Sequence, residues 1–556
     1  MAVIGFALVL GTLAALLEGY HFGGGDQIEQ LPLILRALDP SFAPGDFYIN
    51  ASQGFSPRTY YVQLVAALAR VLPLPAVSVL LAILGNAAVT LVTWLAARDL
   101  LRTSAGGAAL ACVLVMAARG IAPGGSGELH YAAVVPATPA KPLLLLSLWA
   151  ALRLRPVASA ALALAATVLH PLLGIVAGLI ALASTGLNLA LGIGRGERSD
   201  DRFPWRALAV TALAGVGLVG VAWGLWFRHY HASLPASEFV DTMARVRFPH
   251  HRLPSAFPRS ALAATVAFLL ALVISWRWQR ADPRSDRGAA DRLLIPVALT
   301  VLLMIGGWVF VEVIPTRLFT TAQAFRFVFI PKWLGLMLFA ATIARLWRER
   351  PRLWWPGAAV MFTASGTAQG IIMLWGHVVE AARGSAERRR QVGVAAVAGA
   401  GLLGALLLQA WRHDVTELCA LGLFGLLAFA VVRGRSLLVK LGVPVAALAV
   451  TVALLMTGAL TSLPVIGPAA STARPTLTLE QTWAEIAAPC AFARAATPPD
   501  AIFLTPPDLG GFRLLARRAI VVDFKAFPFS DEAIVQWRQR MADCYGPVSA
   551  GGFPAA

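Results

Sequence analysis

The chain has 556 residues, of which 58% are hydrophobic and only 13% are charged, and its mean hydropathy is +0.71. Soluble proteins carry about a quarter charged residues, so this composition excludes a set of soluble domains as well as a disordered or fibrous chain. The formal charge of +17 does not indicate nucleic acid as a partner, because the arginines lie mostly in short segments between apolar runs. That distribution is typical of the cytoplasmic loops of a membrane protein.

Apolar runs of the length that a membrane helix needs, about 20 residues, recur along residues 1–467. The clearest are 2–20, 75–97, 105–121, 207–228, 260–276, 293–314, 329–347, 391–410, 415–432 and 440–465. Shorter pieces are 140–152, 157–169 and 171–192, and a run at 354–378 is interrupted by glycines. We therefore expect an all-α polytopic membrane domain of about 13 to 15 membrane segments, several of them short or broken.

The basic residues between these runs predict the orientation, because cytoplasmic loops carry an excess of Lys and Arg. Clusters assigned to the cytoplasm are 98–102, 153–155, 195–206, 277–292, 345–352, 388–390 and 433–440. With a cytoplasmic N-terminus, the segments that fall outside are 21–58, 122–139, 229–259, 315–328, 411–414 and 468–556. Only four of the 46 basic residues are Lys, and with the abundant Ala and Gly this is typical of a GC-rich bacterial genome. For a multi-pass bacterial protein we expect the inner membrane as its location.

Three segments outside the spans have structure of their own. The segments 28–38 and 59–72 are too short to span and read as amphipathic helices at the interface, so the first external loop, 21–58, is long and structured. From residue 468 the chain becomes more polar, with strand-like runs at 501–505 and 519–524 and helix-like runs at 479–494 and 530–544. These features predict a small external α/β domain, 468–556, that docks on the membrane domain, 1–467.

The C-terminal segment contains two cysteines, Cys490 and Cys544. An external compartment permits disulfides, so a Cys490–Cys544 bond is one expectation. The alternative is that Cys490 is a small core residue of the helix 479–494. The chain has no CxxC, HExxH, Walker or GxGxxG motif, so we assign no metal ligand and leave the cofactor open.

The first candidate for chemistry follows the first apolar run directly. Glycines at 23–25 let the chain leave the membrane helix with unusual backbone angles, which brings Asp26 under the external surface with Glu29 three residues on. A carboxylate in this place can act as a general base or hold a divalent cation. The alternative is a plain helix cap, with Asp26 at the start of the helix and Glu29 at its third position. Asp46, in a Pro-Gly-Asp turn, is expected to bond its own backbone.

The second candidate is a cationic loop between prolines that contains Arg247, His250, His251 and Arg252. The guanidinium group of arginine can donate two parallel hydrogen bonds to phosphate oxygens, and histidine transfers protons or binds metal near neutral pH. The loop is basic, although counting the membrane helices from a cytoplasmic N-terminus places 229–259 outside. Either it binds an anionic group, or it is a solvated structural loop, or a helix has been misplaced in the count.

Two more arginines, Arg317 and Arg326, border another external helix end. Glu312 lies inside the preceding apolar run, where an acid is costly. It is therefore either functional or the partner of a neighbouring arginine. Arg58 belongs to the same external loop as Asp26 and joins the candidates.

At these residues the chain begins to resemble known proteins. The strings GGGDQIEQLP, DPSFAPGDFY, SPRTYY, RFPHHRLPS and WRQRM resemble an uncharacterised family of bacterial polytopic membrane proteins, over nearly the whole chain. The layout also resembles the GT-C superfamily of polytopic glycosyltransferases, which have an acid just after the first membrane helix, a long first external loop and an external C-terminal domain. Several of those enzymes carry paired acids at this point, whereas here Gln27 follows Asp26, which weakens the case for a metal-assisted mechanism.

The resemblance implies transfer of a sugar from a polyprenyl-phosphate donor outside the cytoplasm, with membrane lipids as the other partners. Asp26 would be the base for the acceptor, with Glu29 in reserve. The residues expected to meet substrate or phosphate are Arg58, Arg247, His250, His251, Arg252, Arg317 and Arg326. Two other functions stay open: a transporter or flippase for an anionic lipid-linked or polymer substrate, and a non-catalytic assembly component. The sugar, the acceptor and the oligomeric state do not follow from the sequence.

Overall fold

The structure is a computed structural model that describes residues 2–17, 19–117, 127–193, 204–349 and 474–546, with a few isolated positions between 446 and 459. This part of the chain is mostly helical. The spans expected at 354–378, 391–410, 415–432 and, apart from those isolated positions, 440–465 lie outside the described residues.

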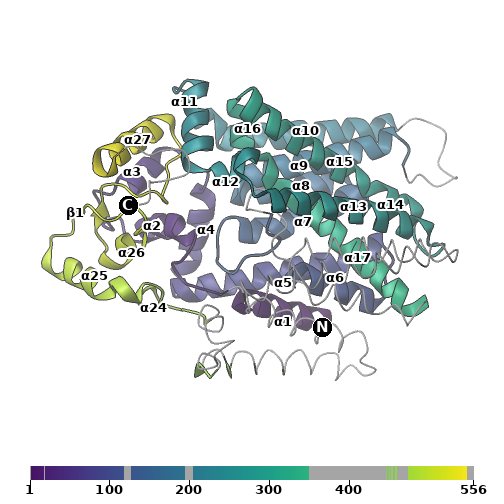
Figure 1. Ribbon diagram of the computed structural model, residues 1–556, viewed down its shortest axis with the longest axis horizontal. Helices are drawn as coiled ribbons and strands as arrows, with labels where there is room; N and C mark the ends of the chain where they lie inside the picture. The colour runs from purple at the N-terminus through teal and green to yellow at the C-terminus, as the bar shows by residue number, and fades with distance from the viewer. Residues whose placement is uncertain are drawn as a thin grey trace.

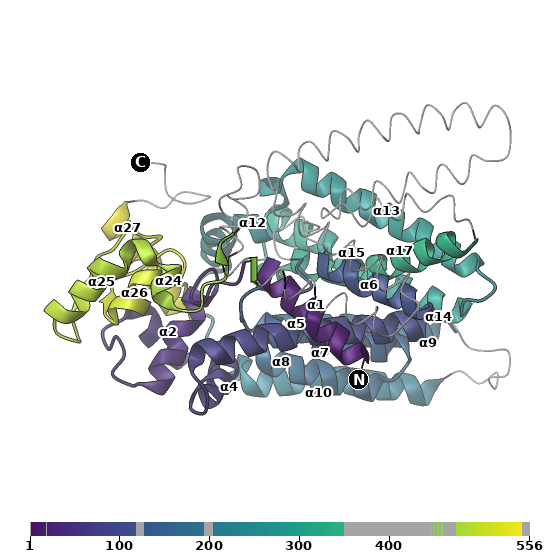
Figure 2. The ribbon, with the colours of Figure 1, turned by 90° about the horizontal axis from the view of Figure 1, so that it is seen from below.

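The apolar helices form an elongated bundle (Figures 1 and 2). In chain order they are α1 (Ala2–Leu17), α5 (Leu74–Leu100), α6 (Ala105–Ala117), α7 (Ala137–Leu152), α8 (Pro156–Leu169), α9 (Pro171–Ala190), α10 (Trp205–Leu225), α13 (Arg259–Ala281), α15 (Leu294–Trp308) and α17 (Phe329–Glu349). Six described stretches are long and apolar enough to cross a membrane: Leu74–Leu100, Pro171–Ala190, Trp205–His229, Ala261–Ala281, Arg287–Val313 and Ala324–Arg345. The expectation of a helical, multi-pass protein is confirmed at this level.

The chain between α8 and α9 breaks where the sequence predicted. His170 ends α8, and its Nδ1 accepts a hydrogen bond from the backbone N–H of Leu173, so the same residue caps α9. Pro171 occupies the first position of α9, where its missing N–H costs nothing. His170 is therefore a helix cap at a break.

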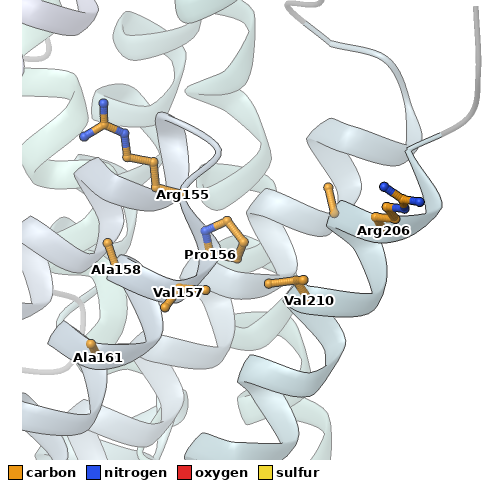
Figure 3. A pocket seen from close by; sticks show the side chains of 8 residues that line it. Arg155, Pro156, Val157, Ala158, Ala161, Arg206 and Val210 are labelled. Carbon is orange, nitrogen blue, oxygen red and sulfur yellow. The ribbon is translucent and has the colours of Figure 1, made fainter.

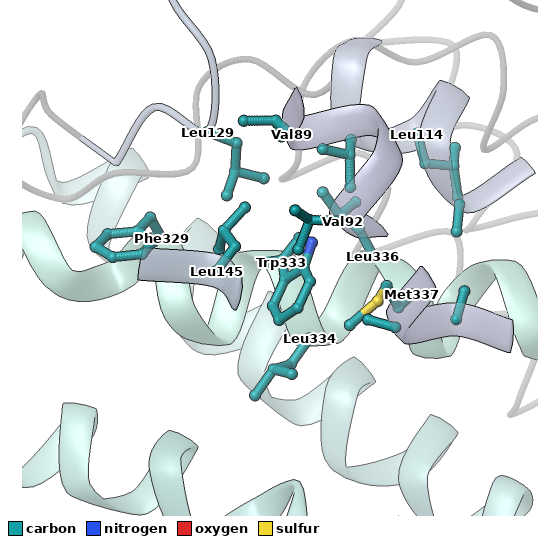
Figure 4. Close-up of a cluster of buried hydrophobic side chains, with 14 of the residues drawn as sticks. Val89, Val92, Leu114, Leu129, Leu145, Phe329, Trp333, Leu334, Leu336 and Met337 are labelled. Carbon is teal, nitrogen blue, oxygen red and sulfur yellow. The ribbon is translucent and has the colours of Figure 1, made fainter. Parts of the chain in front are cut away.

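The centre of the bundle is α17, because 94% of its apolar stretch is buried, whereas only 17% of the apolar stretch of α10 is buried. Trp333 of α17 is fully buried and donates its indole N–H to the Thr93 hydroxyl of α5 at 2.9 Å. Val92, Leu145 and Met337 lie around its ring (Figure 4). A helix that is apolar on all sides is stable at the centre of a bundle, and one that stays exposed has lipid as its neighbour.

Short elements gather at one end of the bundle. Those from the membrane part are α2 (Gln27–Leu38), α3 (Phe47–Gly54), α4 (Thr59–Ala69), η1 (Phe227–His229), α11 (Ala236–Val240), η2 (Asp241–Arg247), α12 (Pro249–Arg252), η3 (Pro254–Ala256), η4 (Val309–Val313), α16 (Arg317–Ala322) and η5 (Ala324–Val328). Here η marks 3₁₀ and π-helical turns. At the other end lies the short α14 (Arg287–Arg292). The loops 21–58, 229–259 and 315–328 thus lie at the same end of the bundle, as expected from the alternation of the membrane helices.

The C-terminal segment is mostly helical and has much less sheet than the α/β domain that the sequence predicted. It contains α24 (Leu479–Thr482), α25 (Ala484–Ala496), α26 (Gly511–Ala516) and α27 (Asp531–Tyr545), with two strands of two residues each, β1 (Ile502–Phe503) and β2 (Ala519–Ile520). The strands are parallel, with Ile502 opposite Ala519. Prolines 506 and 507 follow β1 and cannot donate to a ladder, so the strand-like run ends early.

The C-terminal segment shares its cores with the loops of the membrane part. One buried cluster joins Phe47 of α3 and Phe239 of α11 to Phe527 and Trp537. Another joins Tyr48 and neighbouring residues of the first loop to Leu514 of α26. The expected docking of this segment is confirmed, and its stability depends on the first loop.

The expected Cys490–Cys544 disulfide is wrong. Both cysteines are free: Cys490 is buried in the cluster of α25 and α26, and Cys544 lies beside a different cluster at the end of α27. The alternative, a small core residue at position 490, describes the structure.

We expect reducing agents to leave the thermal unfolding temperature unchanged, because neither cysteine is cross-linked. Alkylation of the unfolded, unreduced protein followed by peptide mass spectrometry checks this. Both Cys490 and Cys544 should carry the label, and an unlabelled pair that becomes labelled only after reduction would contradict the structure.

Candidate functional site

The glycine run after α1 adopts the backbone angles that the sequence predicted. Gly23 and Gly25 have φ of +81° and +56°, which L side chains rarely adopt. A Cβ on Gly23 would also lie 2.2 Å from Cδ2 of Leu479. The indole N–H of Trp483 donates to the Gly23 carbonyl at 3.1 Å, so the run is held against the C-terminal segment. The glycines allow this close approach and place Asp26 at the start of α2.

Asp26 is not a helix cap through its side chain. It precedes α2, but its carboxylate accepts no hydrogen bond from the first turn of that helix. The carboxylate instead accepts from the ammonium of Lys525 at 2.5 Å. The plain capping alternative is therefore wrong, and Asp26 is free to serve another purpose.

The surroundings of Asp26 favour its ionised form. Burial raises the pKa of the Asp26 carboxyl, but the cations of Lys525, Arg326 and Arg58 together outweigh burial and hold the pKa below its usual range. The side chain nevertheless keeps 60% of its surface exposed. The carboxylate is therefore ionised and accessible to a ligand.

Glu29 is buried between two arginines. Arg58 donates to its carboxylate, and Arg247 lies 3.6 Å from the other carboxylate oxygen. Arg58 also donates to the hydroxyl of Tyr48, whose own O–H donates to the Glu29 carbonyl at 2.8 Å. Burial lowers the pKa of Arg58, but the charge and hydrogen bond of Glu29, with Tyr48 and Asp26, together outweigh burial and raise the pKa. Glu29 is thus engaged in holding both guanidinium groups.

Arg247 connects this network to the Asp26 pair. It donates to the backbone carbonyl of Lys525 at 2.7 Å, and its guanidinium lies 4.1 Å from the ring centroid of Phe248. Its side chain is 5% exposed, and burial lowers its pKa. The atom Nε is buried and has no hydrogen-bond partner in the described structure. Arg247 therefore stabilises the Lys525 backbone.

His250 and Arg252 both lie on α12. The side chain of His250 is exposed in part, and its partial burial together with the charges of Arg247 and Lys525 lowers its pKa. Arg252 is 2% exposed and donates to the carbonyls of Thr320 and Met243. Arg252 is therefore engaged with backbone groups, and His250 is the accessible group of the two.

Arg326 is the accessible arginine of the cluster. It lies on η5, half-buried, within electrostatic reach of Asp26, Arg252 and His170. Among the residues that the structure describes, its guanidinium has no hydrogen bond, ion pair or ring contact. A guanidinium without a described partner, within electrostatic reach of an ionised carboxylate, can bind an anion.

Arg317 and Glu312 lie elsewhere, and His251 lies at the edge of the cluster, with its ring centroid 4.0 Å from that of His250. Arg317 donates to Asp531 and to the hydroxyl of Tyr230, which fixes the start of α27. His251 stacks against Phe248 with centroids 6.1 Å apart. Glu312 accepts from the N–H and hydroxyl of Ser255 and pairs with no described arginine, contrary to one expectation. The cluster therefore contains Asp26, Glu29, Arg58, Arg247, His250, Arg252 and Arg326.

Lys525 is the residue that the sequence analysis missed. It lies between β2 and α27, in the loop that Asp523 begins. Arg513 of α26 is fully buried and pairs with Asp46 at 2.6 Å and with Asp523 at 2.9 Å. The signal that could have found it is its rarity, since Lys525 is one of only four lysines in an arginine-rich chain.

Asp46 is structural, as the sequence predicted. Its Oδ1 accepts from the backbone N–H of Ile49 and caps α3, while Oδ2 accepts from Arg513 and from the N–H of Ile520. In the described ranges no group of three or more His, Cys, Asp or Glu is arranged to hold a metal.

The comparisons with known proteins add one finding. The C-terminal residues 484–544 match a domain of unknown function, DUF6798. No curated protein and no solved structure gave a significant match to the chain. The matched segment contains Arg513, Asp523 and Lys525, so this domain supplies the cation that pairs with Asp26.

Proposed function

We propose that the protein is a membrane glycosyltransferase of GT-C-like layout that transfers a sugar from a lipid-phosphate-linked donor. The observation that carries the proposal is the exposed, ionised carboxylate of Asp26 within electrostatic reach of Arg326, whose guanidinium has no described partner, at the boundary between apolar helices and polar loops. A lipid-linked donor has the matching parts: a hydrocarbon tail, a phosphate and a polar sugar.

Each side chain then has a role in one displacement at the anomeric carbon. Asp26 accepts the proton of the acceptor hydroxyl as its oxygen bonds to the sugar. The bond between the sugar and the phosphate oxygen breaks, and the phosphate leaves with the electron pair. Arg326 and Lys525 stabilise the charge on that phosphate. Glu29 holds Arg58 and Arg247 in place and does not react.

Turnover of a lipid-linked donor by the purified full chain tests this proposal. The substrates are polyprenyl-phosphate sugars, and the readout is the appearance of a phosphate-bearing polyprenol with transfer of the sugar. Hydrolysis or transfer that needs Asp26 supports the proposal, and absence of turnover across a panel of donors and acceptors opposes it.

Lys525 gives the proposal a pH dependence. The ammonium of Lys525 lowers the pKa of Asp26, and burial raises it. When the ammonium is removed, the pKa of Asp26 rises, so the carboxylate becomes protonated at a higher pH. We therefore expect Lys525→Met to move the acid limb of the pH–rate profile to higher pH and Lys525→Arg to keep it near its original place. The profile of kcat/KM from pH 4.5 to pH 9 measures the shift. An unchanged limb in Lys525→Met would mean that Asp26 is not the titrating base.

We also propose that this end of the bundle faces away from the cytoplasm, in a bacterial inner membrane. The loops that the positive-inside rule assigns to the cytoplasm lie at the opposite end, where Arg102 pairs with Asp286 and Arg280 with Asp291.

Cysteine labelling checks this orientation. A single exposed cysteine at Ala496 should react with a membrane-impermeant reagent once the outer membrane is opened, and one at Ala281 only after the inner membrane is permeabilised. The reverse pattern would exclude an external site.

Transport is the second candidate, and one observation favours it. Lys141 of α7 is 1% exposed, and its ammonium lies 3.7 Å from the ring centroid of Phe329. A buried cation within apolar helices is a default marker of a substrate path. Flux of a labelled lipid-linked sugar across proteoliposomes, without sugar transfer, would favour this function.

A further inference from the structure

A groove lies between the first turns of α8 and α10 (Figure 3). Its volume is about 620 Å³, and small or branched apolar residues line it, among them Val157, Ala161 and Val210. The other end of α8 is His170, which is within electrostatic reach of Arg326. Fourteen residues of helix, on the order of 21 Å, therefore separate the groove from the Asp26 site.

Two arginines stand at the rim of the groove. Figure 3 shows Arg155 and Arg206 on either side, with Pro156, Val157 and Val210 between them. Both are exposed, and in the part of the chain that the structure describes neither side chain has a hydrogen bond, ion pair or ring contact.

Some other arginines at the same end of the bundle do have carboxylate partners. Arg153, two residues before Arg155, lies 3.4 Å from Asp99, and Arg280 lies 3.0 Å from Asp291. Arg155 and Arg206 thus place two exposed positive charges at the two edges of one apolar groove, without a described carboxylate partner. The N-termini of α8 and α10 point to the same rim, and their dipoles add to its positive potential.

The groove opens on the lipid-facing side of the bundle. Leu213 and Val216 of α10 are 69% and 70% exposed, so this helix presents apolar side chains outward. Trp205, next to Arg206, is 72% exposed, and tryptophan is typical of the boundary between hydrocarbon and headgroups. The rim therefore lies at headgroup level, and the apolar floor extends toward the hydrocarbon.

We propose that this groove is a binding site for an anionic phospholipid, with the phosphate between Arg155 and Arg206 and one acyl chain along Val157, Ala161 and Val210. The charge argument selects the lipid class. A zwitterionic headgroup would bring its own cation to two guanidinium groups, and a free phosphate would leave the apolar floor empty. The site is separate from Asp26, and the inference does not depend on the proposed function.

Native mass spectrometry of the full chain in detergent tests the site. Dimyristoyl phosphatidylglycerol and dimyristoyl phosphatidylcholine are added at equal concentration, and the bound fraction of each is measured. Two surface arginines favour the anionic lipid by about ten- to thirtyfold. We expect the wild-type chain to show this preference and Arg155→Gln/Arg206→Gln to lose it. The fold should not change, because both side chains are exposed and have no described partner.

The control is Arg228→Gln/Arg259→Gln, which removes the same charge from exposed positions at the other end of α10 and the start of α13. It should keep the preference. Ala161→Phe, which fills the groove, should weaken the binding of phosphatidylglycerol and leave the rim intact. An excess of inorganic phosphate should not displace the lipid.

Four results would overturn the proposal: equal binding of the two lipids, an unchanged preference in the rim variant, full affinity in Ala161→Phe, or displacement by inorganic phosphate. The last would mean that the arginines bind any phosphate and that the groove has no part in it.

Discussion

Asp26→Asn should lower sugar transfer by about 10²–10⁴-fold, the usual contribution of a general base, while the protein still folds and inserts. The amide has almost the shape of the carboxylate but cannot accept the proton. Folding should be preserved because the Asp26 side chain caps no helix and is 60% exposed. Its partner Lys525 is 38% exposed and can be solvated when the pair is lost. Initial rates with a lipid-linked donor, compared at equal amounts of folded protein, measure the effect.

The matched control is Asp39→Asn. Asp39 also pairs with a cation of the C-terminal segment, Arg517, at 2.5 Å, but it lies at the far end of α2. Both variants lose one ion pair between the first loop and the C-terminal segment, and Asp39→Asn also weakens the hydrogen bonds that Asp39 accepts from Ser41. Near-normal rates in Asp26→Asn, or an equal loss in Asp39→Asn, would remove Asp26 from the mechanism.

Arg513→Met should destabilise the docked C-terminal segment by about 3–5 kcal/mol, the cost of removing one partner from a buried ion pair. Arg513, Asp46 and Asp523 are all fully buried, so the variant leaves two carboxylates in the interior without their cation. The buried thiol of Cys490 is a natural probe, because it reacts only when its cluster opens. Its alkylation rate as a function of temperature measures the loss.

Arg517→Met is the control for that experiment. Arg517 pairs with Asp39 across the same two parts of the chain, but the two side chains are 34% and 40% exposed, so the expected cost is about 0–1 kcal/mol. Equal alkylation of Cys490 in both variants would show that the buried pairs contribute no more than a surface pair. A further consequence concerns Lys525, which follows Asp523 by two residues. If Arg513→Met loosens the loop that carries Lys525, the acid limb of the pH–rate profile should move to higher pH, as in Lys525→Met.

The helices of the membrane part could be predicted from local pattern. Leu74–Leu100 and Pro171–Ala190 are long apolar runs, and the break at Pro171 follows from the fixed geometry of proline. The unusual backbone angles of the glycine run at 23–25 could also be predicted, because tolerance of positive φ is a local property of glycine. The gathering of the loops 21–58 and 229–259 at one end followed from counting helices.

Partners could not be predicted in the same way. Asp26 pairs with Lys525 and Asp46 with Arg513, each across more than 450 positions of sequence, and no local pattern encodes such contacts. The sequence analysis therefore singled out Asp26 as a candidate and read Asp46 as structural, but it did not connect either residue to the C-terminal segment. It also overestimated the sheet there, because strand-like composition does not supply a neighbouring strand.

By itself, the sequence determined that this is a helical, multi-pass chain with an unusual acid after its first apolar helix, because hydropathy, glycine and proline act over a few residues. Only the tertiary structure decided which cations are engaged and which are free. Arg252, Arg247 and Arg317 look alike in sequence to Arg326, yet the first three donate to carbonyls or to a buried carboxylate and Arg326 has no described partner. The reason is physical: charge is a property of the residue, but its compensation depends on what the fold brings within a few ångströms.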